Sequence, residues 1–132
     1  MKDSKILIVE DDNLFVLVLK KLLVKKEGFK NKNVFLAKDG VEAIKMAKEE
    51  KFDLILMDVQ MEEMDGLEAT AIIRGINKHY QEVPILIITG FAMNGDKEKC
   101  LESGATDYLS KPVDNKFLIE TIKFHLEKFL KK

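Results

Sequence analysis

The stretch that decides the fold runs from residue 52 to residue 66 and reads Phe52-Asp53-Leu54-Ile55-Leu56-Met57-Asp58-Val59-Gln60-Met61-Glu62-Glu63-Met64-Asp65-Gly66. Its apolar run, Leu54 to Met57, has no polar alternation, which is typical of a strand buried on both faces. The run ends on Asp58, and a helical pattern begins after a glycine-bearing loop. In open parallel α/β sheets, ligands bind outside the carboxyl ends of the strands. The pattern therefore predicts that Asp58 lies at such an edge, where a carboxylate is a candidate for chemistry.

Strands and helices are predicted to alternate along the whole chain. The expected strands cover residues 5–9, 33–37, 54–58, 83–89 and 107–110, and the expected helices cover residues 13–26, 41–51, 67–77, 96–101 and 115–130. In the first helix the apolar stripe consists of Leu14, Val18 and Leu22, with Leu19 and Leu23 at its edge. Parallel neighbours need right-handed crossovers, so this alternation predicts an α/β fold with a doubly wound five-stranded parallel sheet.

Composition indicates an ordinary globular chain. Its 132 residues are 46% hydrophobic and 34% charged, so we expect residues 1–132 to form a single domain with its own core. A net charge of -1 does not indicate nucleic acid or a membrane surface as a partner. No apolar run approaches the ~20 residues of a membrane helix, and the N-terminus lacks an apolar signal core, so we expect a cytoplasmic protein. The single Cys100 is interpreted as a reduced packing residue.

The predicted sheet collects polar side chains at its carboxyl edge: Glu10, Asp11, Asp12, Asp58, Thr89 and Lys111. Crowded carboxylates repel one another, and a divalent cation reduces that cost. An oxygen-only ligand set favours a hard ion, which inside a cell is Mg²⁺. The two histidines, His79 and His125, are isolated from these acids in the sequence. The edge is therefore predicted to be a magnesium site.

A magnesium ion held by few carboxylates has room for phosphate oxygens, which predicts a phosphoryl-transfer site. Asp58 is the candidate nucleophile, since a carboxylate can form an acyl phosphate. Lys111 would hold a phosphoryl oxygen as a point charge, and the Thr89 hydroxyl would hold another.

These residues resemble the receiver domains of two-component response regulators. The matching motifs occur in order between residues 5 and 130: Ile6-Leu7-Ile8-Val9-Glu10-Asp11-Asp12, Met57-Asp58-Val59-Gln60-Met61 with Met64-Asp65-Gly66, Thr89, Gly104-Ala105 with Tyr108, and Lys111-Pro112. The resemblance implies a flavodoxin-like sheet with strand order 2-1-3-4-5. It also implies a cis peptide bond between Lys111 and Pro112, a form that only X-Pro bonds adopt cheaply.

The resemblance further implies a phosphorelay function. Asp58 would accept a phosphoryl group from the phosphohistidine of a sensor histidine kinase or a histidine phosphotransfer protein. Glu10, Asp11, Asp58 and the main-chain carbonyl of Gln60 would hold Mg²⁺, and Asp12 is not assigned to the metal. The domain would be a regulatory phosphoprotein and not an enzyme.

A switch pair is also implied by the resemblance. Thr89 and Tyr108 match residues that rearrange on phosphorylation, changing a face around the fourth helix, fifth strand and fifth helix for a downstream protein target. A core aromatic role explains Tyr108 nearly as well. The chain ends directly after its last predicted helix, which leaves open a stand-alone regulator or a receiver cut from a hybrid kinase.

Two other functions compete with phosphoryl acceptance. A pseudo-receiver would bind partners without phosphorylation, but the intact set of Glu10, Asp11, Asp58, Thr89 and Lys111 argues against it. An aspartate-nucleophile phosphohydrolase generally has a second acid two residues after the nucleophile, where this chain has Gln60. Departures from the family pattern are expected to affect the lifetime of the phosphoryl group: Glu62 replaces a common proline, while Gly90 would leave the site open and Phe91 would restrict that same access, with the net effect of the last two left open.

Overall fold

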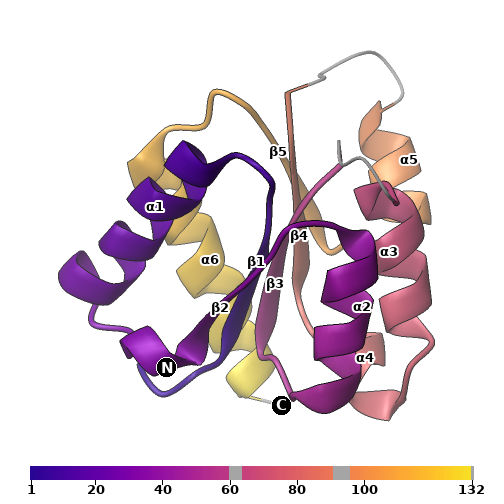
Figure 1. Cartoon of the computed structure of the whole chain (residues 1–132), viewed down its shortest axis with the longest axis horizontal. Coiled ribbons are helices and arrows are strands. Elements are labelled where there is room, and N and C mark those ends of the chain that lie inside the picture. The colour runs from indigo at the N-terminus through magenta and orange to yellow at the C-terminus, as the bar shows by residue number, and fades with distance from the viewer. Residues whose placement is uncertain (60–63, 91–95, 132) are drawn as a thin grey trace.

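The computed structural model describes residues 1–59, 64–90 and 96–131, which form a parallel sheet between two layers of helices (Figure 1). The strands are β1 (Ile6–Val9), β2 (Val34–Ala37), β3 (Leu54–Asp58), β4 (Ile85–Thr89) and β5 (Asp107–Ser110). All neighbouring pairs are parallel, and the order across the sheet is β2-β1-β3-β4-β5. The predicted fold class and strand order are therefore confirmed.

Helices cover both faces of the sheet. They are α1 (Asn13–Lys21), its π-helical continuation η1 (Leu22–Lys26), the 3-10 turn η2 (Asn31–Asn33), α2 (Gly40–Glu49), α3 (Gly66–Arg74), α4 (Lys78–Glu82), α5 (Asp96–Glu102) and α6 (Asn115–Leu130). Figure 1 shows α1 and α6 on one face, and α2, α3, α4 and α5 on the other. Helix α4 was not predicted, because its five residues contribute one buried apolar side chain, Tyr80. The Asn77 side chain caps it by accepting from the Tyr80 N–H at 3.2 Å.

Successive strand residues enter opposite cores, which explains the unbroken apolar runs in the sequence. In β3, Ile55 and Met57 pack toward α2 and α3, whereas Leu54 and Leu56 pack toward α1 and α6. All five residues of β3 are buried, including Asp58 at its end. Cys100 is also buried, in the core on the α2 side. Across the described ranges, no helix is long and apolar enough to cross a bilayer.

The apolar stripe predicted for α1 was wrong for Leu14 and Val18, whereas Leu22 packs partly buried against the core and the two residues at the edge of the stripe lie within it. Leu19 and Leu23 are buried, whereas Leu14 is 71% exposed and Val18 is 43% exposed. Nearly every residue between Leu14 and Val24 is apolar, so the helical period alone did not single out the buried face. Packing against the sheet selects that face and leaves an apolar surface on the other side of α1.

Candidate functional site

Strand ends deliver the predicted site residues to one edge of the sheet. These residues follow or end four different strands: Glu10 and Asp11 after β1, Asp58 at the end of β3, Thr89 at the end of β4, and Lys111 after β5. Val9 pairs with Met57 in the register, so the next residues, Glu10 and Asp58, lie at the same level. The carboxyl edge therefore gathers groups that are far apart in the sequence.

Three carboxylates form a cluster at this edge. Glu10, Asp11 and Asp58 each offer one oxygen, and these oxygens lie within 4.8 Å of one another. Glu10 and Asp58 are buried, while Asp11 is exposed. An all-oxygen donor set of this size fits a hard divalent cation that keeps part of its water shell. Gln60, the fourth predicted ligand, lies outside the described residues.

Lys111 lies over the carboxylate cluster. Its Nζ is 2.5 Å from Glu10 Oε1 and 4.0 Å from Asp58 Oδ2. Its backbone N–H donates to the Thr89 carbonyl oxygen at 2.7 Å, which ties the ends of β4 and β5 together. The Lys111–Pro112 peptide bond is cis, as the family resemblance implied. A positive charge is therefore available beside the predicted phosphoryl acceptor.

The pKa of Glu10 is raised above its ordinary value. Burial is the largest cause, and the nearby Asp58 carboxylate raises the pKa further. The Lys111 ammonium and the Asp12 backbone N–H act in the opposite direction without cancelling the shift. A carboxylate that is desolvated beside a second anion is stabilised in its charged form by an added cation. The electrostatics of Glu10 thus agree with the metal-binding geometry.

Asp12 and Phe15 connect α1 to the site. Asp12 caps α1, because its Oδ1 accepts from the backbone N–H groups of Leu14 at 3.0 Å and Phe15 at 3.2 Å. This role is separate from the three-carboxylate cluster. The Phe15 ring lies 4.6 Å from Lys111 Nζ, a cation–π contact that the sequence reasoning missed. Its only sequence signal is an aromatic residue one helical turn after the acidic triplet.

Gly66 leaves room for the backbone that carries Asp58. Its N–H donates to the Val59 carbonyl oxygen at 3.0 Å. A Cβ at this position would lie 2.2 Å from the Asp58 carbonyl oxygen. Asp65 then caps α3 by accepting from the Glu68 N–H at 2.8 Å. The Asp-Gly pair in the sequence therefore both closes the loop and starts the helix.

Thr89 and Tyr108 lie on neighbouring strands. Thr89 pairs with Ser110, and Tyr108 pairs with Ile87. The two predicted switch residues are therefore offset by two residues along the paired strands. Thr89 is buried, and Tyr108 is half-buried beside a hollow of about 300 Å³ that Phe117 also lines. The space next to Tyr108 is where a change in its ring position would alter the surface.

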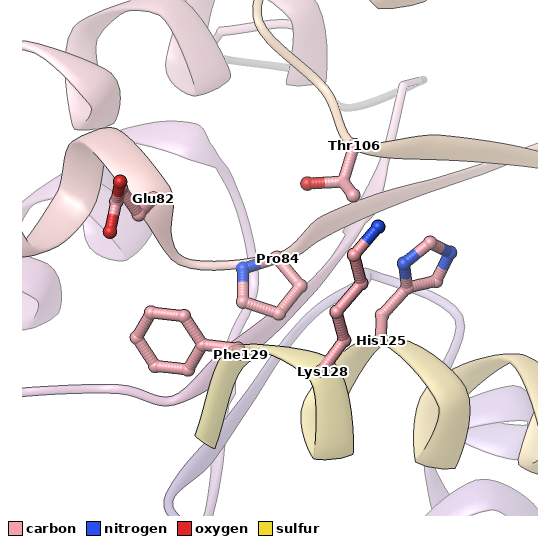
Figure 2. Close-up of a pocket in the computed structure, with 6 residues that line it drawn as sticks. All are labelled: Glu82, Pro84, Thr106, His125, Lys128 and Phe129. Atoms are coloured by element: carbon pink, nitrogen blue, oxygen red, sulfur yellow. The ribbon is translucent and has the colours of Figure 1, made fainter. Parts of the chain in front are cut away.

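A separate hollow lies at the opposite, amino end of the sheet, and Figure 2 shows it. Its volume is about 270 Å³, and its lining residues are Glu82, Pro84, Thr106, His125, Lys128 and Phe129. His125 Nε2 pairs with Asp107 Oδ2 at 2.9 Å, and His79 Nε2 is 2.7 Å from the Phe52 carbonyl oxygen. Both histidines therefore have structural partners away from the carboxylate cluster.

Comparisons with known proteins identify the family of the chain. The response regulator receiver domain model matches residues 6–123. Hybrid signal transduction histidine kinase I of Dictyostelium discoideum is 41% identical over 98% of the chain, which spans 8% of that kinase. The polar-differentiation response regulator DivK of Brucella anthropi is 36% identical, with 93% of this chain and 96% of DivK covered.

A solved structure is similar throughout. It is the receiver domain of a sensor histidine kinase from Pseudomonas aeruginosa, with a magnesium ion coordinated in its active site cleft. The two sequences are 34% identical, and the match covers 95% of this chain and 98% of the Pseudomonas aeruginosa chain, with a TM-score of 0.83. With the family match over residues 6–123, these similarities show that the chain belongs to the receiver domains of two-component response regulators.

Proposed function

We propose that Asp58 accepts a phosphoryl group from a phosphohistidine of a sensor histidine kinase or histidine phosphotransfer protein. The observation that carries this proposal is the convergence of three carboxylate oxygens within 4.8 Å, with the Lys111 ammonium 4.0 Å from Asp58 Oδ2. Glu10, Asp11, Asp58 and the Gln60 carbonyl would hold Mg²⁺. Residues 1–132 act as a single regulatory receiver unit in the cytoplasm, where ATP-dependent kinases supply such donors.

The transfer is a substitution at phosphorus. An Asp58 carboxylate oxygen forms the new O–P bond while the P–N bond to the donor imidazole breaks, and the electron pair of that bond stays on the imidazole. Bound Mg²⁺ supplies charge neutralisation at the phosphoryl oxygens. The Lys111 ammonium neutralises a further oxygen, and the Thr89 hydroxyl donates to another. Glu10 anchors Lys111 before transfer through the 2.5 Å contact between Nζ and Oε1.

Phosphorylation would act as a switch. The new group adds about −1.5 to −2 charge, which attracts Lys111 and the Thr89 hydroxyl. Movement of Thr89 frees space on the Tyr108 side of β4 and β5, and the Tyr108 ring turns inward. The affected surface lies over α5, β5 and α6, where the exposed Phe117 and Phe124 offer contacts for a downstream protein.

A test with acetyl phosphate addresses this function without knowledge of the natural donor. The chain is incubated with acetyl phosphate, in parallel with Mg²⁺ and with EDTA in its place, and the intact mass is measured. We expect the mass gain of one phosphoryl group with Mg²⁺ and none with EDTA. No gain in either sample overturns the proposal and favours a pseudo-receiver that binds partners without phosphorylation.

Removing the Phe15 ring is expected to slow phosphorylation. The ring holds Lys111 Nζ at 4.6 Å, and such a contact is worth about 1 kcal/mol when partly desolvated. Phe15→Leu keeps an apolar side chain but loses the π face, so the rate of mass gain should fall about fivefold. Phe15→Tyr keeps the π face and should restore most of the rate. Equal rates of mass gain for Phe15→Leu and the unmodified chain would show that the Phe15 ring does not contribute to phosphorylation.

A further inference from the structure

The hollow drawn in Figure 2 is a candidate binding site that lies apart from Asp58. We call it the amino-end hollow, and its lining consists of Glu82, Pro84, Thr106, His125, Lys128 and Phe129. Pro84 and Thr106 directly precede β4 and β5, whereas Asp58 is the last residue of β3. Because these strands are parallel, the hollow and Asp58 lie at opposite ends of the sheet. The hollow is therefore separate from the carboxylate cluster.

The amino-end hollow combines an apolar floor with polar groups at its sides. Pro84 is buried and Phe129 is half-buried, and both rings contribute apolar surface. Figure 2 shows Glu82 on one side of the Pro84 ring, and Thr106 and Lys128 on the other. The volume of about 270 Å³ is several times the ~30 Å³ that one water molecule occupies in the liquid. The hollow can therefore hold a small organic molecule, with a few polar groups to orient it.

The Thr106 hydroxyl has a hydrogen left to donate to a ligand. Its Oγ1 accepts from the Ile85 N–H at 3.0 Å and from the Arg74 guanidinium at 3.1 Å. A hydroxyl has two acceptor lone pairs and one O–H donor, so these two contacts use its acceptor capacity. No residue in the described part of the chain accepts the remaining O–H. Thr106 can therefore act as a donor toward a ligand oxygen in the hollow.

Two cations beside the hollow have no anionic partner among the residues that the structure describes. Arg74 is half-buried, and it donates to three backbone carbonyl oxygens and to the Thr106 hydroxyl, all of them uncharged. Lys128 forms no ion pair within the same ranges. Asp107 is already paired, because its Oδ2 lies 2.9 Å from His125 Nε2. A partly desolvated cation without a counter-ion is stabilised by an added anion, so this side of the hollow favours a negatively charged group.

We propose that the amino-end hollow binds a small organic carboxylate with an apolar body. The carboxylate accepts hydrogen bonds from the Thr106 hydroxyl and the Lys128 ammonium. The apolar body lies on the rings of Pro84 and Phe129. Glu82, on the other side of the lining, repels a second negative charge, which favours a singly charged carboxylate over a more highly charged phosphate. This inference does not depend on phosphorylation of the chain, and it is tested without Mg²⁺ or a phosphoryl donor.

The test uses benzoate as the probe carboxylate and benzamide as its uncharged match in size. NMR measures the backbone amide shifts of the full chain as each compound is added at neutral pH and fixed ionic strength. We expect saturable shift changes at Thr106, His125 and Lys128 with benzoate, and binding of benzamide that is weaker by about fivefold or more. Lys128→Gln should weaken benzoate binding about fivefold because it removes the cation, and Glu82→Gln should strengthen it about twofold because it removes the repelling charge.

The matched control is Lys116→Gln, which removes the same charge from an exposed residue in the first turn of α6 and should leave benzoate affinity unchanged. Lys128 and Glu82 are exposed as well, so their variants should keep the stability of the unmodified chain. No saturable binding of benzoate, equal binding of benzamide, or equal weakening by Lys116→Gln and Lys128→Gln overturns the inference. Shift changes confined to the edge of the sheet at Asp58, or tighter binding of inorganic phosphate than of benzoate, also overturn it.

Discussion

Replacing Asp58 with asparagine is expected to abolish the Mg²⁺-dependent gain of a phosphoryl group from acetyl phosphate. The amide is not a nucleophile at neutral pH, and the change also removes one of the three carboxylates that lie within 4.8 Å of one another. Intact mass spectrometry measures the gain. Because Asn matches Asp in size, we expect the urea unfolding midpoint of Asp58→Asn to stay at or above that of the unmodified chain.

The matched control for this variant is Asp3→Asn. Asp3 pairs with Lys30 at 2.6 Å near the amino end of the sheet, away from the carboxylate cluster. We expect Asp3→Asn to gain the phosphoryl group at the same rate as the unmodified chain. A full gain in Asp58→Asn would show that another residue accepts the group, and loss of the gain in both variants would point to a general effect of lost negative charge.

Gly66→Ala is expected to have the largest effect on stability. The added Cβ would lie 2.2 Å from the Asp58 carbonyl oxygen and 2.9 Å from the Asp58 carbonyl carbon, so backbone must move to accommodate it. We expect the free energy of unfolding to fall by about 3 kcal/mol, at the upper end for overpacking. Urea denaturation measures the change. Displacement of Asp58 should also slow phosphorylation.

Gly90→Ala is the matched control, because a Cβ at Gly90 would have no atom within 4 Å among the described residues. Its free energy of unfolding should lie within about 0.5 kcal/mol of the unmodified chain. If Gly66→Ala were equally neutral, the close packing of α3 against the end of β3 would be wrong as described.

The sheet could be predicted from the sequence because buried parallel strands are short, unbroken apolar runs. The run from Leu54 to Met57 identified β3, and Asp58 marked its carboxyl end. The buried face of α1 could not be predicted, since an almost wholly apolar helix has no distinct stripe until Leu19 and Leu23 pack on the sheet. The interaction with the sheet, and not the helical period, decided that face.

The candidate site was predictable where a residue follows directly from a strand end. Glu10, Asp58 and Lys111 qualify, and parallel topology brings them together. Contacts between distant segments were not predictable. Arg74, the last residue of α3, donates to the Gly104 carbonyl oxygen at 2.8 Å and to the Thr106 hydroxyl at 3.1 Å.

The pKa of Arg74 is lowered, because burial removes water from around its charged guanidinium. Such a side chain is held by backbone acceptors from several loops, and the spacing of residues in the sequence does not indicate these contacts.

The predicted roles of Gln60 in metal binding and of Tyr108 in switching remain predictions.

Chemical trapping of the acyl phosphate tests phosphorylation of Asp58 most directly. After treatment with acetyl phosphate and Mg²⁺, borohydride reduces an aspartyl phosphate to homoserine, and tandem mass spectrometry of the digested chain locates the product. We predict homoserine at position 58 and nowhere else, with none formed in EDTA. Homoserine at position 11 or 12 with intact Asp58, or no product in the presence of Mg²⁺, would contradict the proposed role of Asp58.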